Sequence, residues 1–404
     1  MFADFRASEK ESEKELGKRI EEKTMRFGIG QPEIDAVADC IRKGELARFQ
    51  VGANGRIARC EKELAAMSGT KYALLVNSGT SALICGMVAL GIGPGDDVLV
   101  SSYTWISSPL APMLVGAIPR LVEMDDTLTM DPDDLEAKIR PDPKAIICVH
   151  MMNMPCDMDR IMAIANRHGI PVLEDACQAV GGLYKGRRLG SFGKISAYSF
   201  NNYKNISCGE GGAVITDDEE LYDRARLYHD AGTFVQNYEH AVQIPFFAGQ
   251  DYRASEIQAA ILLEQLKRLD PGMERWRDRV RLMRGLIKKR GGFHIARHND
   301  PDSACALLLQ FDTEAEADAF SQKHHCLRLI NSGRHVFTNW APLTERRAYR
   351  DDVNPLITPK GLLAKYDESA APRTLDLMRR TCDVTPTWDM TDEQVAARVD
   401  AFYA

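Results

Sequence analysis

Four short stretches of the sequence carry residue types that could do chemistry, and each follows an apolar run typical of a buried strand. The first is the segment NSGTS at positions 77–81, which follows the run YALLV. Small and hydroxylated residues at the start of a helix expose backbone N–H groups at the positive end of the helix dipole, which suits a phosphate monoester. Serine and threonine also cap helices that bind no ligand, so this segment alone leaves both interpretations open.

A carboxylate and an amine occur in two further stretches. Asp175 follows Glu174 at the end of the run PVLED, where a carboxylate that leaves a buried strand is costly unless it has a cationic partner. Lys204 lies in the polar loop NNYKN, ahead of the glycine cluster GEGG. A lysine desolvated in such a loop can become a nucleophile toward carbonyl groups, whereas most lysines are solvated surface charges.

An aromatic pair, Tyr103 and Trp105, forms the fourth stretch after the run DVLV. Either ring could stack on a flat ligand or fill the core. The ligands of an α/β sheet bind beyond the carboxyl ends of its strands, and all four stretches are expected there. Phosphate donors, a carboxylate, an amine and an aromatic plate together complement pyridoxal phosphate (PLP).

The segments around these stretches predict the elements that must position them. Seven apolar runs indicate strands, over 72–76, 97–102, 118–124, 145–150, 171–175, 194–200 and 211–216. Continuous apolar runs with amphipathic stretches between them indicate a mainly parallel sheet covered by helices on both faces. Two long helical patterns follow, over roughly 253–269 and 271–290, and a smaller α/β unit comes after them.

This pattern predicts an α/β protein in three parts. A charged arm over 1–24 precedes a large domain over 25–290, and a small C-terminal α/β domain covers 291–404. In the small domain the runs ACALLLQF and CLRLI indicate strands, and the capping boxes that begin at Thr313 and Thr391 indicate helix starts.

Composition argues against several classes of protein. The 404 residues include 51 Lys and Arg against 58 Asp and Glu, a net charge of −7, so attraction to nucleic acid is not expected. No apolar run approaches the roughly 18 residues that span a bilayer, and the N-terminus is charged where a signal peptide is apolar, so we expect a cytoplasmic protein without a membrane partner. The ten cysteines include no C-x-x-C pair, so we expect reduced thiols. The run His324, His325 and Cys326 has no companion cluster of metal-binding residues, so we expect no metal.

Four longer motifs carry a resemblance to a known family. NSGTSAL, VLEDACQAVG, SFNNYKNISCGEGGAVIT and DYRASEIQAA, in this order, resemble the motifs of the DegT/DnrJ/EryC1/StrS family of PLP-dependent sugar aminotransferases. The resemblance runs from about Phe27 to Asp270 and continues more loosely through the C-terminal part. It implies the aspartate-aminotransferase fold (PLP fold type I), PLP as cofactor, and a homodimer whose subunits share the active sites.

The resemblance also implies roles for individual residues. Lys204 would hold PLP as an internal aldimine, and Asp175 would pair with the pyridinium nitrogen and keep the ring an electron sink. Gln178 would lie near the phenolic oxygen, with Trp105 and Cys177 on the two faces of the ring. The phosphate cup would be formed by Gly79, Thr80, Ser81 and Ser199.

One position departs from the family pattern. Many relatives have an asparagine that reaches the cofactor phosphate across the dimer, whereas this chain has Asp251. A carboxylate beside a phosphate is repulsive unless it is protonated or countered by Arg253. Arg253 is also a candidate anchor for an anionic group of the substrate. Arg334 and His335, which follow the run CLRLI, are further candidates for a substrate contact.

The activity that the resemblance implies is the transfer of an amino group from glutamate or glutamine to a ketone on a sugar, nucleotide sugar or cyclitol, by a ping-pong mechanism. The alternative is a PLP-dependent sugar dehydratase or deoxygenase of the same family. Relatives with that activity can carry His at the lysine position, so Lys204 favours transfer. A non-catalytic regulator or scaffold is expected to have lost the cofactor residues, which this chain keeps. The identity of the acceptor stays open.

Overall fold

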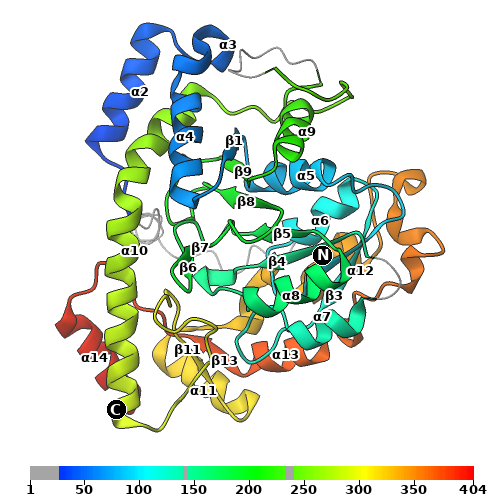
Figure 1. Cartoon of the computed structure of the whole chain (residues 1–404). Helices are drawn as coiled ribbons and strands as arrows, with labels where there is room; N and C mark the ends of the chain where they lie inside the picture. Colours follow the sequence, from blue (N-terminus) through cyan, green and yellow to red (C-terminus); the bar gives the residue numbers. More distant parts are fainter. Residues whose placement is uncertain (1–26, 140–142, 233–240) are drawn as a thin grey trace, which may run out of the picture.

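The computed structural model describes residues 27–139, 143–232 and 241–404 (Figure 1). The charged arm predicted over 1–24 lies outside these residues. A seven-stranded sheet forms the centre of the larger part, with the strand order β1-β9-β8-β5-β4-β2-β3. Its strands are β1 (Tyr72–Val76), β2 (Asp97–Ser101), β3 (Ile118–Val122), β4 (Ala145–Val149), β5 (Val172–Asp175), β8 (Ile195–Ser199) and β9 (Gly212–Thr216).

Each of the seven predicted apolar runs contains one of these strands. β9 is antiparallel to both of its neighbours, β1 and β8, whereas the other neighbouring strands of this sheet are parallel. The predicted fold class, an α/β fold with a mainly parallel sheet, is therefore confirmed.

Helices cover both faces of this sheet, which is why its strands are apolar without alternation. Along β1, Leu74 and Val76 belong to one buried apolar cluster and Leu75 belongs to the other. The first cluster includes side chains from α5 (Gly79–Ala89), α6 (Ser107–Leu114) and α9 (Glu219–His229). The second includes side chains from α4 (Arg56–Ser68), α7 (Pro132–Lys138), α8 (Met158–His168) and α10 (Glu256–Arg290).

The two helical patterns predicted over 253–269 and 271–290 form one helix, so the predicted break between them is wrong. α10 runs for 35 residues with Pro271 inside it, and Figure 1 shows it as the long helix beside α2 (Gln31–Lys43). Proline removes one backbone hydrogen bond from a helix and crowds the preceding turn. Leu269 and Met273, on either side of Pro271, are buried in the core. Packing of the apolar face therefore outweighs the local preference.

The C-terminal part contains a second sheet of four antiparallel strands, with the order β10-β11-β13-β12. Its strands are β10 (His294–Ile295), β11 (Leu308–Gln310), β12 (Leu327–Arg328) and β13 (Thr381–Asp383). The runs ACALLLQF and CLRLI thus form shorter strands than predicted, and β13 has no counterpart in the prediction. Thr313 and Thr391 cap their helices as predicted. The helices of this part are α11 (Glu314–His324), α12 (Ala341–Thr344), α13 (Pro372–Arg379) and α14 (Asp392–Tyr403).

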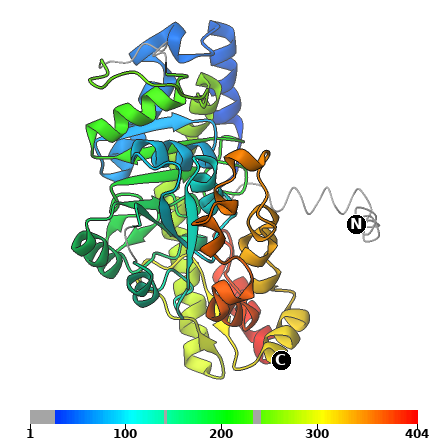
Figure 2. The same ribbon diagram turned by 90° about the vertical axis from the view of Figure 1, so that its right-hand side faces the viewer.

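Between β12 and α13 the chain returns to the large sheet. Trp340 and Leu356 are fully buried in the same apolar cluster as Val98 and Val100 of β2. In Figure 2 this segment, drawn in orange, lies against the blue-green elements of the sheet. The residues after 291 therefore pack against both sheets, and a domain boundary at 290 stays a prediction.

Three further short elements are α3 (Arg48–Val51) and the two strands of a hairpin, β6 (Leu183–Tyr184) and β7 (Arg187–Arg188). Within the described ranges, no helix combines the length and the apolar character that crossing a membrane requires.

His229, the last residue of α9, is a buried histidine that makes the folded protein sensitive to acid. Burial, and then the charges of Arg48, Arg226 and Arg253, lower the pKa of His229 to about 3. The unfolded chain binds this proton near the ordinary pKa of 6.5. The stability is therefore fully present above about pH 6.5 and is lost as the pH falls toward about 3.

We expect this linkage to cost about 2 kcal/mol of unfolding free energy between about pH 7.5 and about pH 5. His229→Gln removes the titrating group, so the variant should lose less stability over this interval than the unchanged chain. Urea denaturation at both pH values measures the difference. His294→Gln changes an exposed histidine and is the matched control. Equal losses in His229→Gln and the unchanged chain would contradict the assignment.

Candidate active site

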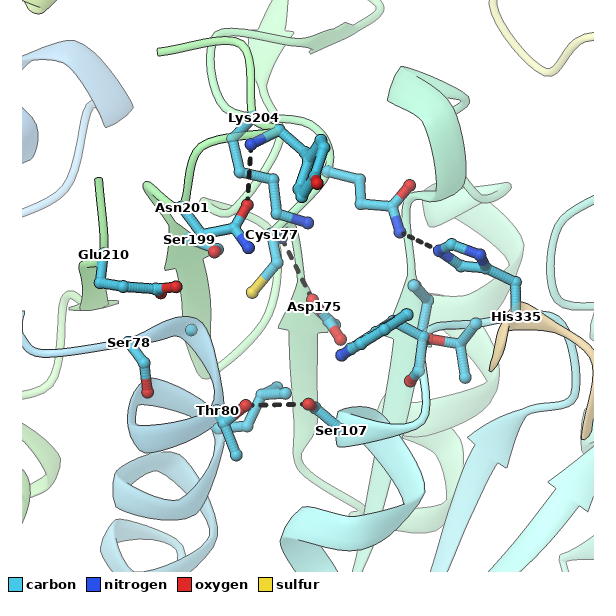
Figure 3. Close-up of a pocket in the computed structure, with 17 residues that line it drawn as sticks. Ser78, Thr80, Ser107, Asp175, Cys177, Ser199, Asn201, Lys204, Glu210 and His335 are labelled. Carbon is cyan, nitrogen blue, oxygen red and sulfur yellow. Dashed lines mark hydrogen bonds between the residues drawn. The ribbon is translucent and has the colours of Figure 1, made fainter. Parts of the chain in front are cut away.

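The carboxyl ends of β1, β2, β4, β5 and β8 meet at one edge of the sheet, around a cavity of about 310 Å³ (Figure 3). Most of the residues predicted for the site line it: Gly79, Thr80, Trp105, Asp175, Cys177, Gln178, Ser199, Lys204 and His335. The other predicted residues, Ser81, Asp251, Arg253 and Arg334, do not belong to its lining.

The first turn of α5 forms a cup of N–H and hydroxyl groups at one end of the cavity. Ser78 caps the helix by accepting a hydrogen bond from the Ser81 N–H at 3.0 Å. Thr80 Oγ1 lies 2.8 Å from the Oγ of Ser107 (Figure 3). Ser81 Oγ donates to Asn77 Oδ1 at 2.6 Å, so this hydroxyl stabilises the turn rather than facing the cavity. The other N–H and hydroxyl groups of this turn lie at the positive end of the α5 dipole, where they suit a phosphate.

Asp175 ends β5 and is only 4% exposed. Ser108 Oγ donates to its Oδ2 at 2.6 Å, and the Cys177 N–H donates to its Oδ1 at 3.1 Å. Ser108 is itself bonded to Thr104 Oγ1 at 2.6 Å. Among the described residues no basic side chain pairs with Asp175, so a cationic group of a ligand would complete its interactions.

Glu174 points to the opposite side because side chains alternate along a strand. Its carboxylate accepts hydrogen bonds from the N–H groups of Gly190 at 2.8 Å and Gly193 at 2.6 Å, and lies 3.0 Å from His150 Nε2. Burial raises the pKa of Glu174, whereas the hydrogen bonds from His150 and from backbone N–H groups lower it by more. The pKa of Glu174 therefore lies below its usual range. Glu174 is thus satisfied inside the protein, and Asp175 is the carboxylate of the cavity.

Lys204 projects into the cavity from the loop between β8 and β9 (Figure 3). The turn that carries it is fixed by its backbone N–H, which donates to the Asn201 carbonyl at 3.0 Å. Burial, and then the charge of Asp175, raise the pKa of the nearby Cys177 thiol well above its usual range, although the charge of Lys204 opposes this. Cys177 is therefore an uncharged packing group.

The predicted aromatic pair divides into two roles. Tyr103 is 3% exposed and fills the core, with its hydroxyl against Met152 Sδ at 3.5 Å. Trp105 is 39% exposed and lines the cavity. Its ring lies 5.3 Å from the ring of His335, with an angle of 56° between the two planes. Trp105 and His335 therefore form one wall of the site.

Arg253 is held by two carboxylates at the end of β1. Its guanidinium donates to Asp230 at 2.8 Å and to Asp251 at 2.6 Å. Asp230 is fully buried, and Asn77 N–H donates to the Tyr252 carbonyl at 2.9 Å, which places this segment beside the cup. The charge of Asp251 is therefore countered by Arg253 within the same chain.

Arg334 lies at the exposed rim of the site. Its guanidinium lies over the Trp105 ring, 5.8 Å from the ring centroid. Within the described ranges it has no carboxylate partner, in contrast to Arg253.

Several residues of the site were missed by the sequence reasoning. Ser108 has no local signal, because only the packing of α6 brings its hydroxyl to the end of β5. Glu210, in the loop just before β9, lies on the same side of the cavity as Ser78 and Ser199 (Figure 3). The lining also includes Thr104, Ser107, Asn201 and Tyr203. In the residues that the structure describes, no group of three His, Cys, Asp or Glu side chains could hold a metal ion.

Residues 29–402 match the sequence profile of the DegT/DnrJ/EryC1/StrS aminotransferase family. The chain belongs to this family. The predicted membership is thus confirmed, and pyridoxal phosphate is the cofactor, as predicted. The site fits this group, because it offers a cup of phosphate donors, an amine, and a buried carboxylate that no basic side chain of the described ranges neutralises, all around one cavity.

Three known proteins are similar to this chain. The spore coat polysaccharide biosynthesis protein SpsC of Bacillus subtilis strain 168 is 40% identical over 257 residues, which cover 61% of this chain and 64% of SpsC. The match thus spans less than two thirds of the length of that relative.

Two solved structures show the same fold. The aminotransferase from Psychrobacter cryohalolentis is 27% identical, with a TM-score of 0.75 and coverage of 93% of this chain and 96% of that one. The E. coli GDP-4-keto-6-deoxy-D-mannose-3-dehydratase with bound hydrated PLP is 19% identical, with a TM-score of 0.77 and coverage of 94% and 99%. At 19% identity, the similarity to the dehydratase shows a shared fold alone.

Gly79 is the position where the cup tolerates no side chain. A Cβ there would lie 2.7 Å from Ser199 Cβ and 3.0 Å from Cys177 Sγ. We expect Gly79→Ala to weaken PLP binding by about tenfold or more, because the strand end and the helix must separate. Equilibrium binding of PLP to the apoprotein measures the loss. Gly93→Ala, with open space around the added Cβ, is the matched control. Unchanged affinity in Gly79→Ala would contradict this role.

Proposed function

We propose that this chain is an aminotransferase that moves an amino group from glutamate or glutamine to a ketone on a sugar, nucleotide sugar or cyclitol, in two half-reactions. The observation that supports this best is the convergence of Lys204, the buried carboxylate of Asp175 and the cup of α5 on one cavity. An amine, an acid partner and an anion site in that arrangement are the minimum that amino-group transfer requires.

Each residue of the cavity has a separate task. The donors around Thr80 and the α5 dipole bind the phosphate. Asp175 would hold a proton at the ring nitrogen of the cofactor, and Trp105 and Cys177 would lie against the two faces of its ring. Pyridoxal phosphate, when bound, supplies an aldehyde that joins amines covalently and a ring that accepts electrons.

Lys204 has two tasks in this proposal. Its Nζ would provide the amine to which the cofactor attaches, and it would be freed when the amino donor takes its place. Once free, Nζ would move the proton from Cα of the donor to the cofactor carbon that receives the amino group. In the second half-reaction it would take a proton from that carbon and deliver it to the acceptor carbon.

We infer that Arg334 and His335 contribute to binding of the substrates. Two carboxylates already neutralise the charge of Arg253, whereas the guanidinium of Arg334 contacts only the face of Trp105 among the described side chains. A guanidinium at the rim suits a carboxylate of the amino donor or a phosphate of the acceptor. Arg334 is therefore the better placed of the two arginines for this role.

The alternative function is a dehydratase or deoxygenase on the same fold. Both functions can begin with an amino donor, so the fate of its nitrogen separates them. With ¹⁵N-labelled glutamate and a panel of ketosugars and ketocyclitols, a transferase leaves the label on the sugar product. Release of labelled ammonium with a deoxygenated product would support the dehydratase instead.

We expect Lys204→Ala to abolish turnover and leave the fold intact, because the side chain does chemistry and contributes little packing. Steady-state transamination and thermal melting of the same preparation measure both effects. Lys194→Ala removes an exposed lysine that pairs with Asp218, and it is the control. Turnover close to that of the unchanged chain in a folded Lys204→Ala protein would remove this residue from the mechanism.

We further propose a homodimer whose subunits share the active sites, with Asp251 and Arg253 next to the cup. Asp251→Asn should bind PLP at least as tightly as the unchanged chain, because a negative charge near the phosphate is lost. Arg253→Ala should weaken PLP binding, and the loss should be smaller in the Asp251→Asn background.

The melting temperatures of the same variants are measured as well, because Arg253→Ala also removes the ion pair between Arg253 and the buried Asp230. Sedimentation shows the oligomeric state directly. Equal losses of PLP affinity from Arg253→Ala in both backgrounds would contradict the coupling between Asp251 and the phosphate.

A further inference from the structure

The side-chain amide of Gln178 is held between two groups from distant parts of the chain. Its Oε1 accepts a hydrogen bond from the Met152 N–H at 3.3 Å. Its Nε2 lies 3.2 Å from the Nε2 of His335, at the edge of the cavity (Figure 3). Because the Met152 N–H can only donate, the amide oxygen must face Met152 and the amide nitrogen must face His335.

The second ring nitrogen of His335 fixes its tautomer. Nδ1 lies 3.0 Å from the Ser332 carbonyl, which can only accept, so Nδ1 carries a hydrogen. Burial, and then the charge of Lys204, lower the pKa of His335, although the bond to Ser332 opposes this. In the neutral ring Nε2 has a free lone pair and accepts from the Gln178 amide. All three bonds thus agree on one arrangement of hydrogens.

Both ends of this chain of bonds are rigidly supported. Met152 has φ 52° and Asn153 has φ 60°, a backbone conformation that is costly for residues with a side chain and persists where the surroundings impose it. On the other side, the carbonyl of Arg334 accepts from Trp340 Nε1 at 2.7 Å, and Val336 forms a β-bridge with Tyr103. The two groups that hold Gln178 therefore have little freedom to move.

We propose that His335 is a positioning residue, which as the neutral Nδ1–H tautomer fixes the Gln178 amide so that its second N–H is available to the ligand of the cavity. This positioning role goes beyond the proposed function. It rests on that function in one respect, namely that the ligand of the cavity is the cofactor. A protonated His335 would present an N–H to the amide N–H₂ group. The amide would then have to turn and lose its bond to Met152, so the neutral ring is essential.

The first test needs neither the cofactor nor a variant. Long-range ¹⁵N NMR of the imidazole nitrogens in the apoprotein at about pH 7.5 distinguishes the protonation states. The expected result for His335 is a protonated Nδ1 and an unprotonated Nε2. The opposite tautomer, or the doubly protonated ring, overturns the proposal.

The second test uses the absorbance of the PLP-loaded protein without any substrate. His335→Phe keeps a ring beside Trp105 but removes the acceptor, so the pH midpoint of the cofactor band should shift. The rate of the glutamate half-reaction should fall by about tenfold with little change in KM. His335→Gln, whose oxygen can accept from the amide, should restore the midpoint.

A simple substrate contact by His335 gives a different result. It would raise the KM and leave the spectrum without substrate unchanged, and that outcome overturns the proposal. Gln178→Ala should shift the band in the same direction, and adding His335→Phe to it should have no further effect. Independent, additive shifts also overturn the proposal. Failure of the unchanged protein to bind PLP would instead contradict the proposed function.

Discussion

A buried carboxylate, Asp175, which pairs with no basic side chain of the described residues, is the constraint on which the arrangement of this site depends. Asp175 lies at the end of a central strand, where loss of hydration is costly. A hydroxyl from Ser108 and the Cys177 N–H offset part of that cost. Ser108 belongs to α6, so α6 must pack with its first turn against the end of β5. A cationic group of a ligand would complete the interactions of Asp175.

The same sheet edge separates neighbouring residues into structural and chemical roles. Glu174 is one residue from Asp175, yet it faces backbone N–H groups and His150 and has no access to the cavity. Ser81 follows Thr80, yet its hydroxyl turns back to the loop. Direction along a strand or around a helix turn therefore decides which polar residue of a motif meets the ligand.

Much of this organisation could be predicted from the sequence because it is local. Strands buried on both faces produce continuous apolar runs, and the polar residues just after them must lie at the sheet edge. The rest depends on long-range packing. No local pattern brings Ser108 to Asp175 or gives Arg253 its second partner, Asp230, and the continuity of α10 through Pro271 depends on its buried face. The family resemblance predicted which residues have which roles, whereas the contacts between these residues are seen only in the structure.

The wall formed by the segment after β12 has a consequence for the order in which the molecule is assembled. A chain emerging from the ribosome presents the cup, Asp175 and Lys204 more than a hundred residues before His335. Until Trp340 and Leu356 join the apolar cluster that also contains Val98 and Val100 of β2, that part of the core is incomplete and Trp105 lacks the ring of His335. The pocket is thus completed by a segment made late in translation. We therefore expect the cofactor to be retained only after this segment has been synthesised and packed, and not as soon as the sheet has folded.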